Sequence, residues 1–516
     1  MANPFLIALG KTVRFFARLR ASGAGGGSAL PGLVVERISP HFAIPALEAL
    51  PHGVVVISGT NGKTTTTKIV AELLSAQGLR VFTNTSGSNY MRGVISSMLK
   101  EMTLSGHLHA DIAVLELDEA YAVGFVRQIH PRYSLITNVM HDQLDRFGDV
   151  DHTADLLAVI AANTTNTVVL NREDSRLAAL PSRAELTPGA SEDARKETLT
   201  GEALSASVRW YGLAPKLLQT YPQDGTLNGS GHALVAEQDV DVMLSTFEGQ
   251  QAVFTIEGTD YKTELSLKGM FNAFNSAGAL ALVRAILDGE GIGGGPASDP
   301  ASSLAGGSAS SLAGSGTGSS DDPASDIAEN SASGSASSLA GSGTGPSTDP
   351  ASSPAGDPAT LTKALLVTLS TIRSAFGRGE SVLIDGRELE LILVKNPGGF
   401  RLSLESFDPA GHATMIAIND LHGDGRDISW LYDVSFESLK PTGVAVVSGI
   451  RAYDMALRLA YDEVIAQVIE CDLAKALDTL LQTDPSTPCR IYCSYTVMLD
   501  LRKLLAAKTQ VGEVSR

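Results

Sequence analysis

The sequence predicts an α/β protein: a central P-loop domain with a mostly parallel sheet and a C-terminal α/β domain, separated by a disordered insertion. Three observations support this fold class. Short runs rich in Val and Ile alternate with helical stretches, which is typical of parallel sheets with crossover helices. A Gly-rich loop follows the first of these runs and opens a helix. One long segment consists almost entirely of small and polar residues.

The expected elements alternate along the chain on both sides of that segment. Before it, we expect strands over residues 53–58, 79–83, 112–117, 133–138 and 167–170, with a helix over residues 65–77. After it, we expect strands over residues 388–394, 413–418 and 443–447 and helices around residues 451–460, 472–482 and 495–505. This order predicts two α/β domains.

Residues 291–360 form the insertion. They include no aromatic residue, Lys or Arg, and the run SASSLAGSGTG occurs twice, at residues 308–318 and 335–345. Such a composition cannot bury enough apolar surface to offset the entropy of ordering the backbone. We therefore expect disorder, and a flexible insertion rather than a binding element.

Overall composition restricts the function. The chain has 516 residues, which suggests several domains, and its net charge of −18 argues against nucleic acid as a partner. Only three cysteines occur, Cys471, Cys489 and Cys493, so a disulfide-stapled scaffold is not expected. No run of about 18 apolar residues predicts a membrane span. We expect a cytoplasmic protein, peripheral to the inner face of the membrane if its N-terminus binds there.

The strongest chemical signal is the sequence SGTNGKTT at residues 58–65, between a strand and a helix. Glycines let backbone N–H groups surround phosphate oxygens, and the helix N-terminus adds positive potential. Lys63 is suited to neutralising phosphate charge and the Thr64 hydroxyl to binding Mg²⁺. We expect ATP and Mg²⁺ here. The residues assigned to ATP by this loop are Gly59, Thr60, Asn61, Gly62, Lys63, Thr64 and Thr65.

This loop resembles the ATP loop of the Mur ligases and folylpolyglutamate synthetases, which activate a carboxylate as an acyl phosphate. Further blocks follow in the family's order. Glu116 resembles the Mg²⁺-binding glutamate, with Glu119 a weaker candidate, and the run TNVMHDQLDR at residues 137–146 resembles the TN…DHxDR block. The resemblance assigns Asn272, Asn275 and Arg378 to ATP. Read alone, these residues also fit a strand-end carboxylate, a helix cap, a surface ion pair or a turn.

Three departures narrow the resemblance within the family. The loop begins at Gly59, too early for an N-terminal UDP-binding domain, Gln143 replaces the histidine of DHxDR, and KNPGGF at residues 395–400 replaces DYAHxP. This pattern is similar to the MurT subunits of lipid II isoglutaminyl synthase. It implies amidation of the D-glutamate α-carboxylate of the lipid II stem peptide in peptidoglycan synthesis, with lipid II bound at the membrane surface. Ammonia would come from a GatD-type glutaminase in a heterodimer.

The same resemblance suggests which aspartate serves the partner. We expect Asp427 to orient the catalytic histidine of the glutaminase, with Asp433 in reserve, although Asp427 also fits a simple turn residue. Cys489 and Cys493 lack a nearby histidine, so we expect buried structural cysteines rather than a nucleophile. Many MurT chains carry a four-cysteine zinc ribbon, but residues 210–245 have no cysteine and only His232. We therefore expect no structural zinc.

The predicted domain boundaries follow from these motifs. Residues 1–45 form a basic amphipathic segment, 46–290 the central ATP domain and 361–381 the end of that domain, carrying FGRGE; residues 382–516 form the C-terminal MurT-type domain. Residues 5–20 have four basic residues and no acidic one precedes Glu36, which fits either a helix on an anionic membrane or one docked on the ATP domain. The alternative functions are an amino-acid-adding ligase and an inactive ATP-binding scaffold.

Overall fold

The computed structural model describes residues 3–20, 29–84, 90–140, 150–181, 204–218, 239–292, 358–373, 378–421 and 423–508. The side chains of residues 18–20 and 378 are not described. Residues 3–292 and 358–508 belong to one compact unit. The predicted insertion lies outside the described residues except for residues 291–292 and 358–360.

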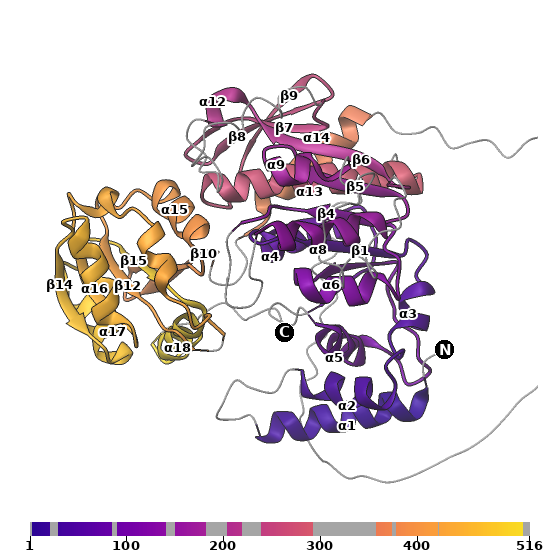
Figure 1. The fold of residues 1–516 in the computed structure, drawn as a ribbon, viewed down its shortest axis with the longest axis horizontal. Coiled ribbons are helices and arrows are strands. Elements are labelled where there is room, and N and C mark those ends of the chain that lie inside the picture. The colour runs from indigo at the N-terminus through magenta and orange to yellow at the C-terminus, as the bar shows by residue number, and fades with distance from the viewer. Residues whose placement is uncertain are drawn as a thin grey trace, which may run out of the picture. The chain divides into compact units, whose positions relative to one another are not determined.

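The first sheet has nine strands in the order β2-β3-β1-β4-β5-β6-β7-β8-β9 (Figure 1). Pairing is parallel from β2 to β7 and antiparallel from β7 to β9. The strands are β1 (Val54–Ser58), β2 (Val81–Thr83), β3 (Ile112–Glu116), β4 (Tyr133–Ile136), β5 (Thr167–Asn171), β6 (Ser207–Leu213), β7 (Val242–Glu248), β8 (Gln251–Ile256) and β9 (Thr259–Glu264).

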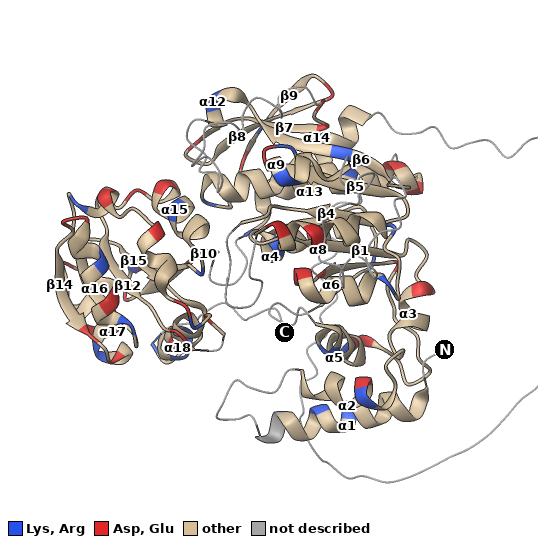
Figure 2. Ribbon diagram, viewed as in Figure 1, with Lys and Arg blue, Asp and Glu red and all other residues tan. Residues whose placement is uncertain are grey.

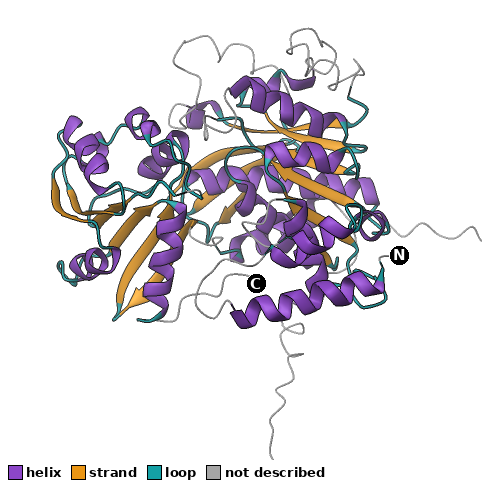
Figure 3. Cartoon of the chain, turned by 60° about the horizontal axis from the view of Figure 1, so that its bottom comes forward, coloured by secondary structure: helices purple, strands orange, loops and turns teal. Residues whose placement is uncertain are grey.

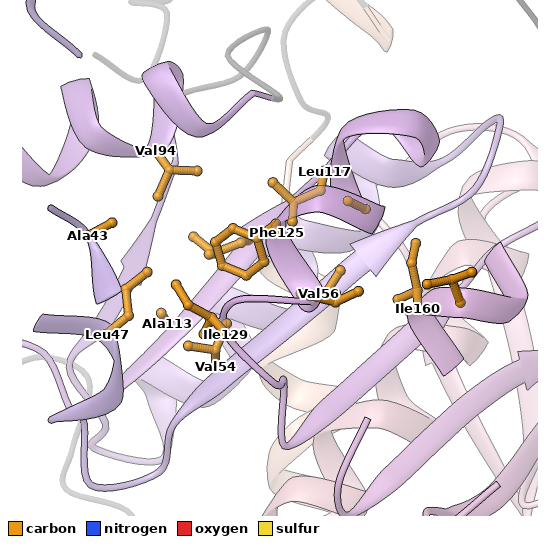
Figure 4. Close-up of a cluster of buried hydrophobic side chains, with 14 of the residues drawn as sticks. Ala43, Leu47, Val54, Val56, Val94, Ala113, Leu117, Phe125, Ile129 and Ile160 are labelled. Atoms are coloured by element: carbon orange, nitrogen blue, oxygen red, sulfur yellow. The ribbon is translucent and has the colours of Figure 1, made fainter. Parts of the chain in front are cut away.

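Helices cover both faces of this sheet. The described helices of residues 3–373 are α1 (Pro4–Arg20), α2 (Leu30–Ile38), α3 (Ile44–Glu48), α4 (Lys63–Ala76), α5 (Met91–Glu101), α6 (Glu119–Val126), α8 (Val150–Ala162), α9 (Ser175–Ala178), α12 (Pro215–Leu218), α13 (Met270–Glu290) and α14 (Pro358–Thr371). Successive strand residues point to opposite faces, so Val54 and Val56 belong to one core and Val55 and Ile57 to the other. Figure 4 shows the first core, where Leu47 and Phe125 lie beside Val54 and Val56.

The second sheet has six strands in the order β10-β11-β15-β12-β13-β14 and is parallel apart from β10. Figure 3 shows its strands among helices, as in the first sheet. Its elements are β10 (Arg378–Ile384), β11 (Arg387–Leu393), α15 (Pro397–Ser406), β12 (Ala413–Ala417), η2 (Ser429–Asp433), η3 (Glu437–Leu439), β13 (Val444–Ser448), α16 (Ala452–Tyr461), β14 (Ala466–Glu470), α17 (Leu473–Leu481), β15 (Cys489–Cys493) and α18 (Tyr495–Ala506).

The predicted α/β class with mostly parallel sheets is confirmed. One local assignment differs from the sequence analysis: residues 378–381, placed there at the end of the central domain, pair with β11 in the second sheet. One described helix, α13, is long and apolar enough to span a membrane, but 89% of its most apolar window is buried inside the protein. This burial makes α13 a core helix of the first sheet.

Candidate active site

The carboxyl ends of three central strands of the first sheet meet at one edge. β1 runs parallel to both neighbours, with Ile57 opposite Glu116 on β3 and Ser58 opposite Ile136 on β4. The loop after β1, the end of β3 and the segment after β4 therefore come together. In open α/β sheets this edge is where ligands bind.

Two glycines shape the loop at residues 59–62. Gly59 has a φ of +118° and Gly62 a φ of +88°, a region that side chains disfavour. A Cβ at Gly59 would lie 2.4 Å from Thr137 Oγ1, and one at Gly62 would lie 2.4 Å from Asn275 Oδ1. Both positions therefore require glycine. The loop leads directly into α4, whose N-terminus has positive potential.

Thr60 and Asn61, which lie between these glycines, form hydrogen bonds with the segment after β4. The Thr60 amide donates to the Asn138 carbonyl at 2.9 Å, and the Thr60 hydroxyl accepts from the Met140 amide at 3.0 Å. The Asn61 amide donates to Asn138 Oδ1 at 2.8 Å, and its carbonyl accepts from the Thr137 hydroxyl at 2.6 Å. The loop is thus fixed by hydrogen bonds to protein groups.

Lys63 is the first residue of α4 and points back into its own loop. Its side chain is buried, and its ammonium donates to the carbonyls of Gly59 and Thr60 and lies 3.3 Å from Glu119 Oε2. Burial of Glu119 opposes its charge, but the positive charges of Lys63 and Lys395 and a backbone hydrogen bond outweigh burial and lower the pKa of Glu119. Glu119, only a weaker candidate in the sequence, is therefore the partner of Lys63.

Thr64 and Glu116 form the second polar pair of the site. The Thr64 hydroxyl donates to Glu116 Oε1 at 2.8 Å. The Asn84 side chain holds the Glu116 backbone, accepting from its amide at 2.9 Å and donating to its carbonyl at 2.8 Å. A hydroxyl and a carboxylate at the edge of a phosphate loop are the protein ligands that Mg²⁺ uses beside nucleotide phosphates, so these residues fit the predicted metal.

The remaining residues assigned to ATP are Thr65 in α4 and Asn272 and Asn275 in α13. Thr65 is buried, and its hydroxyl has no hydrogen-bond partner in the described structure. Asn272 is also buried; its amide donates to the Lys268 carbonyl at 2.8 Å, while its Oδ1 has no partner within the same residues. Asn275 lies over Gly62. Asn275 therefore brings the start of α13 to the loop.

Two residues that sequence reasoning did not assign to the site contact the loop from the second sheet. Lys395 Nζ donates to the Thr60 carbonyl at 3.2 Å. Asn396 and Asn61 exchange two amide hydrogen bonds, at 3.2 and 3.3 Å. Asn396 also accepts from the Gly399 amide at 2.8 Å and so caps α15. Their signal in the sequence was the KNPGGF run, which follows a predicted strand.

A hollow lies against this junction. Its lining combines asparagine amides, the Lys395 cation from the second sheet and apolar side chains. The lining residues are Asn61, Gly62, Asn138, Met140, Phe271, Asn275, Ile392, Leu393, Lys395, Gly399, Leu402 and Ser403. This mixture suits a ligand that has an apolar ring system and a charged end.

Several predicted positions cannot be placed. The DQLDR part of the TN…DHxDR-like block and His232 lie outside the described residues. Arg378 begins β10, but its side chain is likewise outside the description. Their assignments remain predictions.

The two aspartates assigned to the partner both lie in the segment that follows β12. Asp427 is half-buried, and its Oδ1 accepts from the Ser429 amide at 2.8 Å, a turn hydrogen bond. Asp433 is exposed at the end of η2, and its carbonyl accepts from Arg401. The parallel strands β11 and β12 place Asp427 and Lys395 beyond the same edge of the second sheet. The assignment of Asp427, or of Asp433, to the partner's histidine stays a prediction.

The three cysteines have different surroundings. Cys489 and Cys493 are buried at the two ends of β15, and Cys471 is exposed. Burial raises the pKa of both β15 thiols, so neither is activated as a nucleophile. This is the structural role expected from the sequence.

Two family models match parts of this chain. A Mur ligase middle domain matches residues 57–207, and a MurT ligase C-terminal domain matches residues 393–498. The chain is 26% identical to the lipid II isoglutaminyl synthase (glutamine-hydrolyzing) subunit MurT of Streptococcus pneumoniae, covering 94% of this chain and 93% of that one. It is 24% identical to the same subunit of Staphylococcus aureus (strain COL), with 89% of each covered.

Solved structures share the fold. A pseudomurein peptide ligase type C from Methanothermus fervidus has a TM-score of 0.55 at 14% identity, covering 95% of this chain and 86% of that one. A MurF ligase from Thermotoga maritima in complex with ADP has a TM-score of 0.55 at 13% identity, covering 92% and 85%. A bifunctional folylpolyglutamate synthase/dihydrofolate synthase, with Mn, AMPPNP and L-glutamate bound, has a TM-score of 0.53 at 14% identity, covering 92% and 93%.

Proposed function

We propose that this chain is the synthetase subunit of a lipid II isoglutaminyl synthase, because a Mur ligase middle domain and a MurT ligase C-terminal domain match it and MurT subunits resemble it over most of its length. It would use ATP to amidate the D-glutamate α-carboxylate of the lipid II stem peptide. The observation that carries the proposal is the contact of Lys395 and Asn396, in the MurT-type domain, with the phosphate loop of the Mur-type domain.

The proposed reaction has two steps. A carboxylate oxygen attacks the γ-phosphorus of ATP, the bond from that phosphorus to ADP breaks, and an acyl phosphate forms. Ammonia then attacks the acyl carbon, loses a proton, and the carbon–oxygen bond to phosphate breaks to leave the amide. The first step is needed because a carboxylate is inert to amines, whereas phosphate is a good leaving group.

The residues of the loop would act by electrostatics. Lys63 would exchange its hydrogen bonds to the loop carbonyls for bonds to phosphate oxygens, and Arg378 would add a second positive charge. Thr64 and Glu116 would hold Mg²⁺, which neutralises phosphate charge when bound. Asn272 and Asn275 would contact the nucleotide from α13, beside the hollow.

Ammonia is mostly protonated at neutral pH, so a glutaminase partner of the GatD type would deliver it. The second sheet offers a surface for such a subunit. Large apolar side chains are exposed around α16, and Tyr432 of η2 packs on Tyr461 with ring centroids 6.1 Å apart. This α16 patch comprises Tyr432, Ile450, Tyr453, Leu457, Tyr461 and Ile465. It continues into the segment carrying Asp427, so a subunit docked there would meet that carboxylate.

The activity is tested by co-expressing this chain with a candidate glutaminase and supplying lipid II, ATP, Mg²⁺ and glutamine. Mass spectrometry should detect replacement of one OH by NH₂, lost in Lys63→Ala. ATP consumption without amidation, with either glutamine or ammonium, would instead favour an amino-acid-adding ligase. Absence of any ATP turnover with substrate and partner present would favour an inactive scaffold.

The role of Asp427 is tested by changing the nitrogen source. Asp427→Asn should lose most glutamine-dependent amidation but keep amidation driven by ammonium at alkaline pH, because only the glutaminase step needs the carboxylate. Asp433→Asn is the matched control and should retain both activities. If Asp433→Asn shows the selective loss instead, the two assignments are reversed.

A further inference from the structure

Helix α1 has two apolar faces, and its packing explains only one of them. Leu6 and Ile7 are buried in the first core, and Gly10 lies so close to α5 that a Cβ would fall 2.5 Å from Leu99 Cδ1. Lys11 fixes the helix further, donating to the Met102 carbonyl at 2.6 Å. The docked helix predicted as one alternative is therefore present, on this inward face.

The outward face of α1 carries three phenylalanines in solvent. Phe5, Phe15 and Phe16 are 71%, 61% and 62% exposed. At 100° per residue, these positions lie opposite Leu6, Ile7 and Gly10. Ala8 and Thr12 lie between them and are also exposed. The stripe has no charged residue, which is unusual for the solvent side of a docked helix.

The neighbouring helix adds to this surface. α2 packs on α1 and exposes Leu30, Leu33 and Ile38, at 46%, 38% and 57%. Large exposed apolar residues on adjacent helices form a patch rather than scattered single positions. Such patches mark sites of interaction with proteins or membranes.

Charge distinguishes between those partners. Every charged residue of α1 is basic, namely Lys11, Arg14, Arg18 and Arg20, and no acidic residue precedes Glu36. The whole chain nevertheless has a net charge of −18. Figure 2 shows the described charges of α1 as Lys and Arg only. A segment of opposite sign to its own protein, with aromatic residues between its cations, is complementary to an anionic lipid surface.

We propose that α1 is a membrane-interfacial helix. Its inward face anchors it to the ATP domain, while Phe5, Phe15 and Phe16 enter the boundary between headgroups and acyl chains of an anionic bilayer. The net positive charge of the helix would attract it to lipid phosphates. Such binding would bring the loop close to a lipid-linked substrate. This consequence rests on the proposed function, whereas binding to the bilayer does not.

The test measures binding of the full chain to vesicles by flotation, without ATP or partner. Vesicles of phosphatidylglycerol and phosphatidylcholine should bind the chain, and phosphatidylcholine alone should not. High salt should weaken binding because it screens the basic residues. The variant Phe5→Ser/Phe15→Ser/Phe16→Ser should reduce binding by about tenfold or more, since apolar burial supplies much of the affinity.

A matched control removes the same kind of exposed surface elsewhere. Tyr453→Ser/Leu457→Ser/Tyr461→Ser on α16 should bind vesicles like the unchanged chain. All six positions are exposed, so both variants should keep the circular dichroism spectrum and thermal midpoint of the parent. A second variant, Arg18→Gln/Arg20→Gln, should reduce the salt dependence of binding, because it removes two of the four basic residues of α1.

Equal binding by the phenylalanine variant would overturn the proposal, as would equal binding to neutral vesicles. Self-association that requires the three phenylalanines, without vesicle binding, would assign the patch to a second copy of the chain. Failure here remains distinct from failure of the proposed function, because amidation of a detergent-dispersed substrate should survive the phenylalanine changes.

Discussion

Lys63 holds the phosphate loop together with hydrogen bonds to Gly59 and Thr60 and an ion pair to Glu119. All three interactions are buried. A buried ion pair contributes little net stability, but removing one partner strands the other charge in a low dielectric. Lys63 is therefore both a proposed phosphate ligand and the counter-charge of a buried carboxylate.

Lys63→Met should abolish ATP-dependent activity and destabilise the fold by about 3 kcal/mol, because it strands Glu119. Adding Glu119→Gln should restore most stability but no activity. Chemical denaturation and an ATP-turnover assay separate the two effects. Restored activity in the double variant would show that Lys63 serves only the fold.

The same pair predicts a pH dependence. In the folded parent the pKa of Glu119 is lowered, so its stabilising contribution is present above the unfolded pKa and is lost as pH falls through the folded pKa. In Lys63→Met burial should instead raise that pKa. The stability difference between parent and variant should therefore begin to shrink above pH 4.5, the ordinary glutamate value, as the variant's carboxyl protonates, and should shrink further below it as the parent loses its ion pair. A constant difference in denaturation across pH 7 to 4 would contradict this.

Thiol labelling tests the cysteine environments. At pH 8 the native chain should react with iodoacetamide at Cys471 alone, because Cys489 and Cys493 are buried and burial raises their thiol pKa. Peptide mass spectrometry identifies the sites, with the denatured chain as the control in which all three react. Native labelling of Cys493 would contradict its buried position.

At the scale of elements, α15 joins the two sheets through its cap. Asn396 both caps α15 and pairs with Asn61. Asn396→Ala should cost about 1 kcal/mol of stability, as cap losses do, and raise the KM for ATP several-fold. Thermal unfolding and ATP kinetics measure the two quantities.

Asp472→Ala is the matched control, because Asp472 caps α17 through the amides of Ala474 and Lys475. It should lose similar stability and leave the KM for ATP unchanged. If both variants raise the KM equally, the Asn61–Asn396 contact has no specific role at the nucleotide loop.

Local signals account for what the sequence predicted. The phosphate loop needs positive φ at Gly59 and Gly62 and a helix directly after it. Neighbouring residues in the sequence predict both features. The pairing of Lys395 and Asn396 with the loop was missed because it depends on how two sheets meet. The hairpins β7 to β9 were not predicted either, since their half-buried faces interleave polar residues.

At the scale of the whole molecule, the insertion separates α13 from α14 in the sequence. Both helices pack in the same core of the first sheet, the one that contains Val55 and Ile57. The composition of residues 293–357 predicts no fold of their own. Replacing them with a Gly/Ser linker one quarter as long should raise stability by about 1 kcal/mol, since loop closure costs about 0.6 kcal/mol for each doubling of length. Denaturation of both chains measures this, and a loss of stability would mean that the segment packs on the fold.

The four edge strands of the two sheets, β2, β9, β10 and β14, differ in how they are protected from pairing with another chain. β2 has three residues, β9 exposes Asp260, Lys262 and Glu264, and β10 has a register shift after Arg378; short length, charge and bulges each discourage pairing with another chain. The middle of β14 instead exposes Gln467, Val468 and Ile469, beside the α16 patch.

An unguarded apolar strand is an aggregation hazard for a chain synthesised without whatever covers it. Recombinant chain produced alone should therefore accumulate in inclusion bodies more than chain co-produced with the proposed glutaminase partner. In the cell, the same strand would require this chain and the proposed partner to be made in matched amounts, from one message or under one control.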